Sequence, residues 1–93
     1  MEPLGTWRIT FYCNCVECCG VWAGGATASG ADPVPWWTAA TELPFGTVVY
    51  VEGLGEFIVQ DRGVEYGELD IYVGTHEEAL TCGEQWREVY IVR

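Results

Sequence analysis

Two aspartates in the second half of the chain, Asp61 and Asp70, have a type and a spacing that could support acid–base chemistry. Asp61 begins a turn that continues with Arg62 and Gly63, and Asp70 directly precedes the alternating run Ile71–Val73. Two carboxyl groups on adjacent strands raise each other's pKa, and an acid that stays protonated near neutral pH is what glycosidic cleavage requires. From the pattern alone, a turn-starting Asp and a solvent-exposed strand-end Asp are the commoner explanations, and a metal ligand is a third.

The cysteines form a second candidate group, in the stretch "YCNCVECCG" and at one position far downstream. The C-x-C-x-x-C spacing suggests a structural zinc site with Cys13, Cys15, Cys18 and Cys82 as ligands, to which the lone His76 could contribute. Disulfides and buried thiols explain the same residues, and five cysteines leave at least one outside any set of intrachain disulfides. A Cys–His nucleophilic pair is also open, although nothing in the sequence marks one thiol as activated.

Aromatic side chains and the single histidine supply further candidates. Trp36 and Trp37 lie at the end of the long irregular segment "GGATASGADPVPWW", and tryptophans exposed beside a cleft stack on sugar rings. Trp37 is therefore a candidate substrate-binding residue, with burial in the core as the alternative. His76 stands at the start of an expected helix, where a role in the cap is more common than a role as base or ligand.

Short strands must position these residues, because period-2 alternation of apolar and polar residues dominates the chain. The pattern predicts five strands, at Trp7–Cys13, Thr47–Gly53, Gly55–Asp61, Leu69–Val73 and Arg87–Arg93. Gly53 and Gly55 predict a tight hairpin turn. A helix is expected over Thr75–Gly83, with Thr75 as its N-cap, acidic residues in its first turn and Gly83 at its C-terminal end.

Many short strands with one short helix favour a small all-β barrel over a parallel α/β sheet. With a length of 93 residues, the chain is expected to form one domain that spans residues 1–93. Alternation places Asp70 and Tyr72 on one face of their strand, and Leu69, Ile71 and Val73 on the other. If the second face belongs to the core, Asp70 faces a cleft or the solvent.

The charge balance argues against two classes of partner. The chain has 14 Asp and Glu residues against four Arg and no Lys, so it has no basic stripe to bind nucleic-acid phosphates or an anionic membrane surface. No apolar run approaches the roughly 20 residues of a spanning helix, and no signal-peptide pattern is visible at the N-terminus. We expect a monomer that does not insert into a membrane. The protein then works in the cytoplasm, leaves the cell by another route or has had a leader removed.

Five motifs follow one another along the chain, "TFYCNCVECCG", "TASG", "LPFGTVVYVEGLGEFIVQDRG", "LDIYVGTHEEAL" and "REVYIV". Together they resemble the 3D domain family, a group of three-aspartate double-psi β-barrels. That family is related to membrane-bound lytic transglycosylase A and, more distantly, to rare lipoprotein A-like domains. The resemblance covers residues 6–92, and it implies a six-stranded double-psi β-barrel with one short helix near residues 75–83.

The resemblance also implies a peptidoglycan-cleaving function. A lytic transglycosylase cuts the β-1,4 bond between N-acetylmuramic acid and N-acetylglucosamine and leaves a 1,6-anhydro end. By position in the motifs, Asp70 would be the general acid and base, and Asp61 would support it. Thr27, Tyr12 and Thr10 would line the cleft. Peptidoglycan glycan strands would then be the partner, and no cofactor would be needed.

The chain departs from the family pattern at the first of the three aspartates. That residue is expected shortly before "LPFGT", where this sequence offers Thr41 or Glu42. Glu42 is the candidate replacement, with a side chain one methylene longer. The segment between the other two aspartates is also shortened, to "DRGVEYGELD". Two non-enzymatic alternatives therefore remain. One is a glycan-binding module, and the other is a structural phage protein that keeps the barrel but has lost the cleft.

Overall fold

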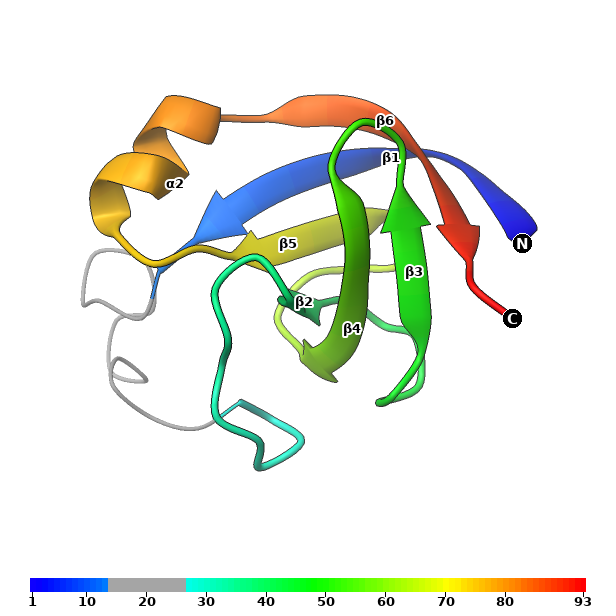
Figure 1. Cartoon of the computed structure of the whole chain (residues 1–93), viewed down its shortest axis with the longest axis horizontal. Coiled ribbons are helices and arrows are strands. Elements are labelled where there is room, and N and C mark those ends of the chain that lie inside the picture. The colour runs from blue at the N-terminus through cyan, green and yellow to red at the C-terminus, as the bar shows by residue number, and fades with distance from the viewer. Residues whose placement is uncertain (14–26) are drawn as a thin grey trace.

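The computed structural model describes residues 1–13 and 27–93, and its strands close into a six-stranded barrel (Figure 1). The strands are β1 (Glu2–Tyr12), β2 (Thr38–Ala40), β3 (Val48–Val51), β4 (Gly55–Asp61), β5 (Glu68–Tyr72) and β6 (Gln85–Ile91). Their order around the barrel is β1-β5-β2-β4-β3-β6. A short helix, α2 (His76–Cys82), precedes β6. The predicted fold class, an all-β barrel with a short helix near residues 75–83, is confirmed.

Apolar side chains fill the barrel because every second residue of each strand points inward. Ile9 and Phe11 on β1 and Leu69 and Ile71 on β5 are all buried. The other strands add Val49, Val51, Phe57, Val59 and Val89 to the same core. The residues between these inward positions face out, so β1 and β5 present their polar side chains on one shared outer surface.

Helix α2 begins and ends where the sequence predicts. The hydroxyl of Thr75 accepts a hydrogen bond from the backbone N–H of Glu78 at 3.1 Å, which caps the N-terminus. At the other end Gly83 adopts a positive φ of 62° and its N–H donates to the carbonyl of Ala79. Ala79 is buried and packs against the barrel core. No helix among the described residues is long and apolar enough to cross a membrane.

The predicted hairpin joins β3 and β4, which pair antiparallel from Val48 and Ile58 to Val51 and Gly55. Gly53 has a φ of 83°, and a Cβ atom there would collide with the guanidinium of Arg87. The turn therefore needs glycine at this position for its backbone conformation, whereas the Arg87 guanidinium is the end of a flexible side chain and could move aside.

The alternation pattern predicted five strands and missed β2. This strand has three residues, and all of them are buried. It pairs in parallel with β4 and antiparallel with β5, and so completes the barrel between them. Two alanines and a threonine give no alternation of apolar and polar residues, so the pattern had no signal there. β1 also begins earlier than predicted, at Glu2 rather than Trp7.

Candidate active site

The polar outer surface of β1 and β5 brings Asp70 next to two residues from the start of the chain. The strands run parallel, and their register pairs Thr10 with Asp70 and Tyr12 with Tyr72. Because the residues on either side of Asp70 are fully buried in the barrel, its carboxyl group points outward. Thr10, Tyr12, Asp70 and Tyr72 therefore share one face, as the alternation of their strands requires.

β2 brings Asp61 onto the same face through an irregularity in its pairing. Ala40 pairs with Asp70 on one side and with Asp61 on the other. The register of β2 against β4 shifts between Ala39 and Ala40, which leaves Gln60 as the extra residue of a β-bulge. Without the bulge, strict alternation would turn Asp61 into the barrel. The two aspartates therefore pair with Ala40 from opposite sides.

The surroundings of Asp70 favour its protonated form. Its pKa is raised from 3.8 to about 6, mainly because burial removes water from the carboxylate, and the negative charges of Asp61 and Glu68 add to this effect. The hydroxyl of Thr10 donates to Asp70 Oδ1 at 3.1 Å, and this bond and the charge of Arg8 lower the pKa in opposition. The net result is a carboxyl group that exchanges a proton close to neutral pH.

Asp61 is held in place by three donors. Its Oδ1 accepts from the backbone N–H groups of Ala28 and Arg62, both at 2.9 Å. Its Oδ2 accepts from the Tyr12 hydroxyl at 3.2 Å. The ring of Tyr12 in turn packs edge-on against Tyr72, with centroids 5.4 Å apart. Asp61 thus joins β4 to β1 and to the turn that begins at Thr27.

Thr27 takes part in this arrangement through the turn that it begins. Its hydroxyl donates to the carbonyl of Ala31 at 2.8 Å, and the side chain is buried. The turn is joined to β4 by a backbone hydrogen bond from Ser29 to Gln60, and Ala28 supplies a donor to Asp61. Within the described residues, Thr27 therefore positions a donor for Asp61.

Thr41 and Glu42 do not supply a third carboxylate to this group. Thr41 is fully buried, and its hydroxyl donates to the carbonyl of Glu68 at 2.7 Å, so it ties β2 to β5. Glu42 is exposed. In the described part of the chain, the charged groups that act on the pKa of Asp70 are Asp61, Arg8 and Glu68.

The structure places Trp36, which the sequence pattern did not favour over Trp37, between the end of β5 and α2. Trp36 has a positive φ of 60°, which is uncommon for a bulky residue. Its backbone N–H donates to the carbonyl of Tyr72 at 2.8 Å, and its ring lies 5.8 Å from that of Phe11. Its indole N–H reaches Glu78 on α2 at 3.0 Å. Trp37 is partly exposed, at 37%.

The cysteine prediction is covered only in part, because Cys15 and Cys18 lie outside the described residues. Cys13 is buried, and its Sγ lies 3.8 Å from Nδ1 of His76. Cys82 is half-buried at the end of α2. Among residues 1–13 and 27–93, no group of three or more His, Cys, Asp or Glu side chains could hold a metal ion. Zinc binding therefore stays a prediction.

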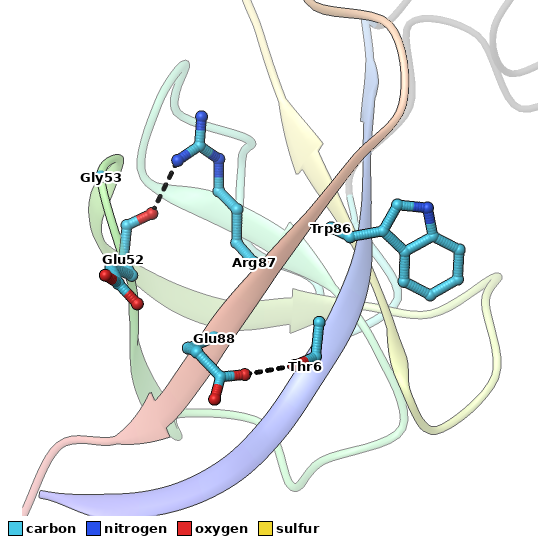
Figure 2. Close-up of a pocket in the computed structure, with 6 residues that line it drawn as sticks. All are labelled: Thr6, Glu52, Gly53, Trp86, Arg87 and Glu88. Atoms are coloured by element: carbon cyan, nitrogen blue, oxygen red, sulfur yellow. Dashed lines mark hydrogen bonds between the residues drawn. The ribbon is translucent and has the colours of Figure 1, made fainter.

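A concave region away from the two aspartates is lined by residues of β1, β6 and the β3–β4 turn (Figure 2). This open cavity of about 430 Å³ is lined by Thr6, Glu52, Gly53, Trp86, Arg87 and Glu88. Thr6 donates to the Glu88 carboxylate, and Arg87 donates to the carbonyl of Glu52 at 3.0 Å. The Trp86 ring points away from Arg87 and is 63% exposed. None of the residues predicted for the site lines this cavity.

Comparison with known proteins identifies a related fold. No protein-family model matches the chain, and no curated protein matches it. Among solved structures, the crystal structure of MltA from E. coli is similar, with a TM-score of 0.63 and 20% sequence identity. The similarity covers 78% of this chain and 28% of the MltA chain, so the chain spans little more than a quarter of that protein. At this identity the likeness establishes an MltA-like barrel fold.

Proposed function

We propose that the protein cleaves peptidoglycan as a lytic transglycosylase, with Asp70 as its general acid and base. The observation that carries the proposal is a half-buried carboxyl group with a pKa of about 6 on the outer face of an MltA-like barrel. The sequence motifs resemble a family related to membrane-bound lytic transglycosylase A, and that resemblance gives Asp70 the role of the acid. A group that titrates near the working pH can both give and take a proton during one turnover.

The reaction needs one carboxyl group in two protonation states. Protonated Asp70 gives its proton to the oxygen that links C1 of N-acetylmuramic acid to N-acetylglucosamine, and the C1–O bond breaks. The resulting carboxylate takes the proton of the muramyl C6 hydroxyl, whose oxygen bonds to C1. This step closes the 1,6-anhydro ring and returns Asp70 to its protonated form, so no water is consumed.

Asp61 would act through Asp70. Its negative charge raises the pKa of Asp70, and its three hydrogen-bond donors keep it in place. Thr10 would orient the Asp70 carboxyl group by its hydrogen bond. A hydrolase would instead need a second carboxylate to activate water or attack the sugar, and Asp61 is the group that could serve.

The remaining predicted residues would contribute to substrate binding. Tyr12 and Trp37 present aromatic surface that can stack on sugar rings. Thr27 would shape the edge of the cleft through its turn, and Glu42 is exposed on the segment that follows β2. The partner is then a glycan strand of peptidoglycan.

Digestion of purified peptidoglycan by the wild type and by Asp70→Asn, with products identified by mass spectrometry, tests the proposal. We expect anhydro-muropeptides from the wild type and a rate lower by a factor of about 10² to 10⁴ in the variant. Asn keeps an oxygen for the Thr10 hydroxyl but cannot donate the catalytic proton, so folding should be preserved. Equal rates from both folded proteins would refute the role of Asp70, and reducing-end products would identify a hydrolase.

A glycan-binding module is the second candidate function. The observation in its favour concerns Thr41 and Glu42, one of which stands where the resemblance expects an aspartate. Thr41 commits its hydroxyl to the carbonyl of Glu68, and Glu42 is not among the charges that act on the pKa of Asp70. Such a module would bind wall polymer and release no products. Binding without cleavage by the folded wild type would therefore support this alternative.

A further inference from the structure

Arg62 directly follows Asp61, and several contacts fix the position of its guanidinium. Nη1 donates to the carbonyl of Thr41 at 2.8 Å and to the carbonyl of Asp61 at 3.3 Å. The guanidinium carbon also lies 3.9 Å from the centroid of the Phe45 ring. A cation that stacks on a ring and is bound to backbone carbonyls has already lost much of its freedom. Arg62 is therefore preorganised to bind a ligand.

These contacts place the positive charge at the backbone that follows β2. Thr41 follows Ala40, the residue that pairs with both Asp61 and Asp70. The backbone N–H of Arg62 also donates to Asp61 Oδ1. Thr41 or Glu42 stands where the resemblance expects an aspartate, so the Arg62 guanidinium binds the backbone beside the position at which the family pattern has an acid.

Arg62 differs from two other arginines in the groups that its guanidinium contacts. Arg8 and Arg93 both form ion pairs with carboxylates. The contacts of the Arg62 guanidinium in the described part of the chain are two carbonyl oxygens and an aromatic ring, none of which carries a full negative charge. Its Nε and Nη2 groups make no hydrogen bond within that part, so they can still donate.

We propose that Arg62 binds a carboxylate of the polymer in the cleft and selects anionic muramyl strands over neutral glycans. The inference rests on the proposed function, which makes peptidoglycan the occupant. That polymer has carboxylates on its stem peptides and, where the peptide has been removed, on the lactyl group of its muramyl residues. The planar guanidinium can bind either of them through two parallel N–H···O bonds.

Saturation binding to insoluble wall polymer tests this inference. We would measure it in the Asp70→Asn background, so that the polymer is not consumed, with Arg62→Gln, Arg62→Lys and Arg93→Gln added in turn. The polymers are native peptidoglycan, the same material with its carboxyl groups converted to amides, and glycan strands stripped of peptide. Arg93→Gln is the control, because it removes an exposed arginine that pairs with Glu2 near the chain ends.

We expect Arg62→Gln to bind native peptidoglycan about tenfold more weakly and to match its parent on the amidated polymer, since only charged carboxylates gain from the guanidinium. Arg62→Lys should recover part of the loss, and Arg93→Gln should bind as its parent does. Equal loss on the stripped strands would identify the lactyl carboxylate as the group that Arg62 binds. Unchanged binding there would identify a carboxylate of the stem peptide instead.

Unchanged binding of Arg62→Gln to native peptidoglycan would overturn the inference. Equal weakening on native and amidated polymer would also overturn it, because the role of Arg62 would then be structural. A failure of every variant to bind would overturn it as well. The proposed function fails separately, if the protein with Asp70 and Arg62 intact yields no cleavage products while binding still depends on Arg62.

Discussion

β1 donates a threonine hydroxyl to a carboxyl group of a neighbouring strand at two places, and the two pairs lie in different environments. Thr10 donates to Asp70 on β5, and Thr6 donates to Glu88 on β6. The first pair is partly buried beside Asp61, whereas the second lies at the open cavity of Figure 2 with Thr6 exposed. The hydrogen bond from Thr10 lowers the pKa of Asp70. The raised pKa of this group therefore comes from desolvation and from the nearby carboxylates. A hydroxyl–carboxyl pair therefore becomes a candidate acid only where the fold removes water and adds negative charge.

The two regions also differ in how many segments converge on them. The site around Asp61 and Asp70 draws on β1, β2, β4 and β5 and on the turn after Thr27, which supplies a backbone donor to Asp61. The cavity is lined by β1, β6 and one hairpin turn, and Arg87 there donates to a backbone carbonyl of Glu52. Four mutational and pH experiments test whether this difference determines function.

The largest expected effect is the dependence of the cleavage rate on pH. The acid must be protonated at the start of each turnover, so the rate should fall about tenfold per unit as pH rises above about 6, the pKa of Asp70. At pH 8 it should be about 100-fold below its plateau. Initial rates on one peptidoglycan preparation between pH 4.5 and 8.5 would measure this. A profile flat to pH 8 would exclude Asp70 as the acid.

The next effect is on stability and is seen with Asp70→Asn. The folded protein holds a proton on Asp70 up to pH of about 6, whereas the unfolded chain releases it near 3.8. The wild type therefore loses stability as pH rises through this window, by about 3 kcal/mol at most, and gains it back on acidification. Asn does not titrate, so above pH 7 the variant should be more stable than the wild type.

Urea unfolding at pH 4, 6 and 8 would measure this difference in the free energy of unfolding. Glu88→Gln is the matched control, because it neutralises the carboxyl group that pairs with Thr6 in the other region. We expect less than about 0.5 kcal/mol for this surface substitution. A variant Asp70→Asn that is no more stable than the wild type at pH 8 would show that Asp70 is not desolvated in the folded protein.

A smaller effect on rate is expected for Asp61→Asn. The substitution removes a negative charge that raises the pKa of Asp70, so the falling limb of the pH–rate profile should move to lower pH. At pH 7 we expect a loss of about tenfold, mostly recovered at pH 5. The amide oxygen can still accept from Ala28 and Arg62, which should preserve the fold. A pH-independent loss as large as that of Asp70→Asn would make Asp61 a direct participant.

The sequence predicted local features well and the geometry of the site poorly, for a physical reason. Thr75 and Gly83 lie at the two ends of α2 as expected, because helix caps depend on residues within one turn. The outward position of Asp70 followed from alternation along β5. The bulge that turns Asp61 to the same face depends on pairing with β2, a strand with no alternation of its own. Pairing between segments leaves no local signal.

The long-range contacts of the site could be reached only through the resemblance. Thr10 and Asp70 are 60 positions apart, and it was the family motifs, not the residue pattern, that placed Thr10 at the cleft. The same motifs pointed to Thr41 or Glu42 for a third carboxylate, and neither supplies one to Asp70. Arg62 was seen only as part of a turn, because its contacts with Thr41 and Phe45 depend on the closed barrel.

The most direct test of the opening comparison comes from changing the two threonines to valine one at a time. Thr10→Val removes a donor that favours the Asp70 carboxylate, so the pKa of Asp70 should rise by about 0.5 to 1 unit, the equivalent of one hydrogen bond. The rate at pH 7.5 should then increase by up to about tenfold, unless the hydroxyl is also needed to orient the acid. Thr6→Val removes the corresponding donor to Glu88 and should leave the whole pH–rate profile unchanged.

A shift of the profile in both variants would mean that the two ends of β1 are electrostatically coupled and that the cavity belongs to the working site. A lower rate in Thr10→Val at every pH, with an unmoved profile, would instead assign Thr10 to positioning the carboxyl group rather than to setting its pKa.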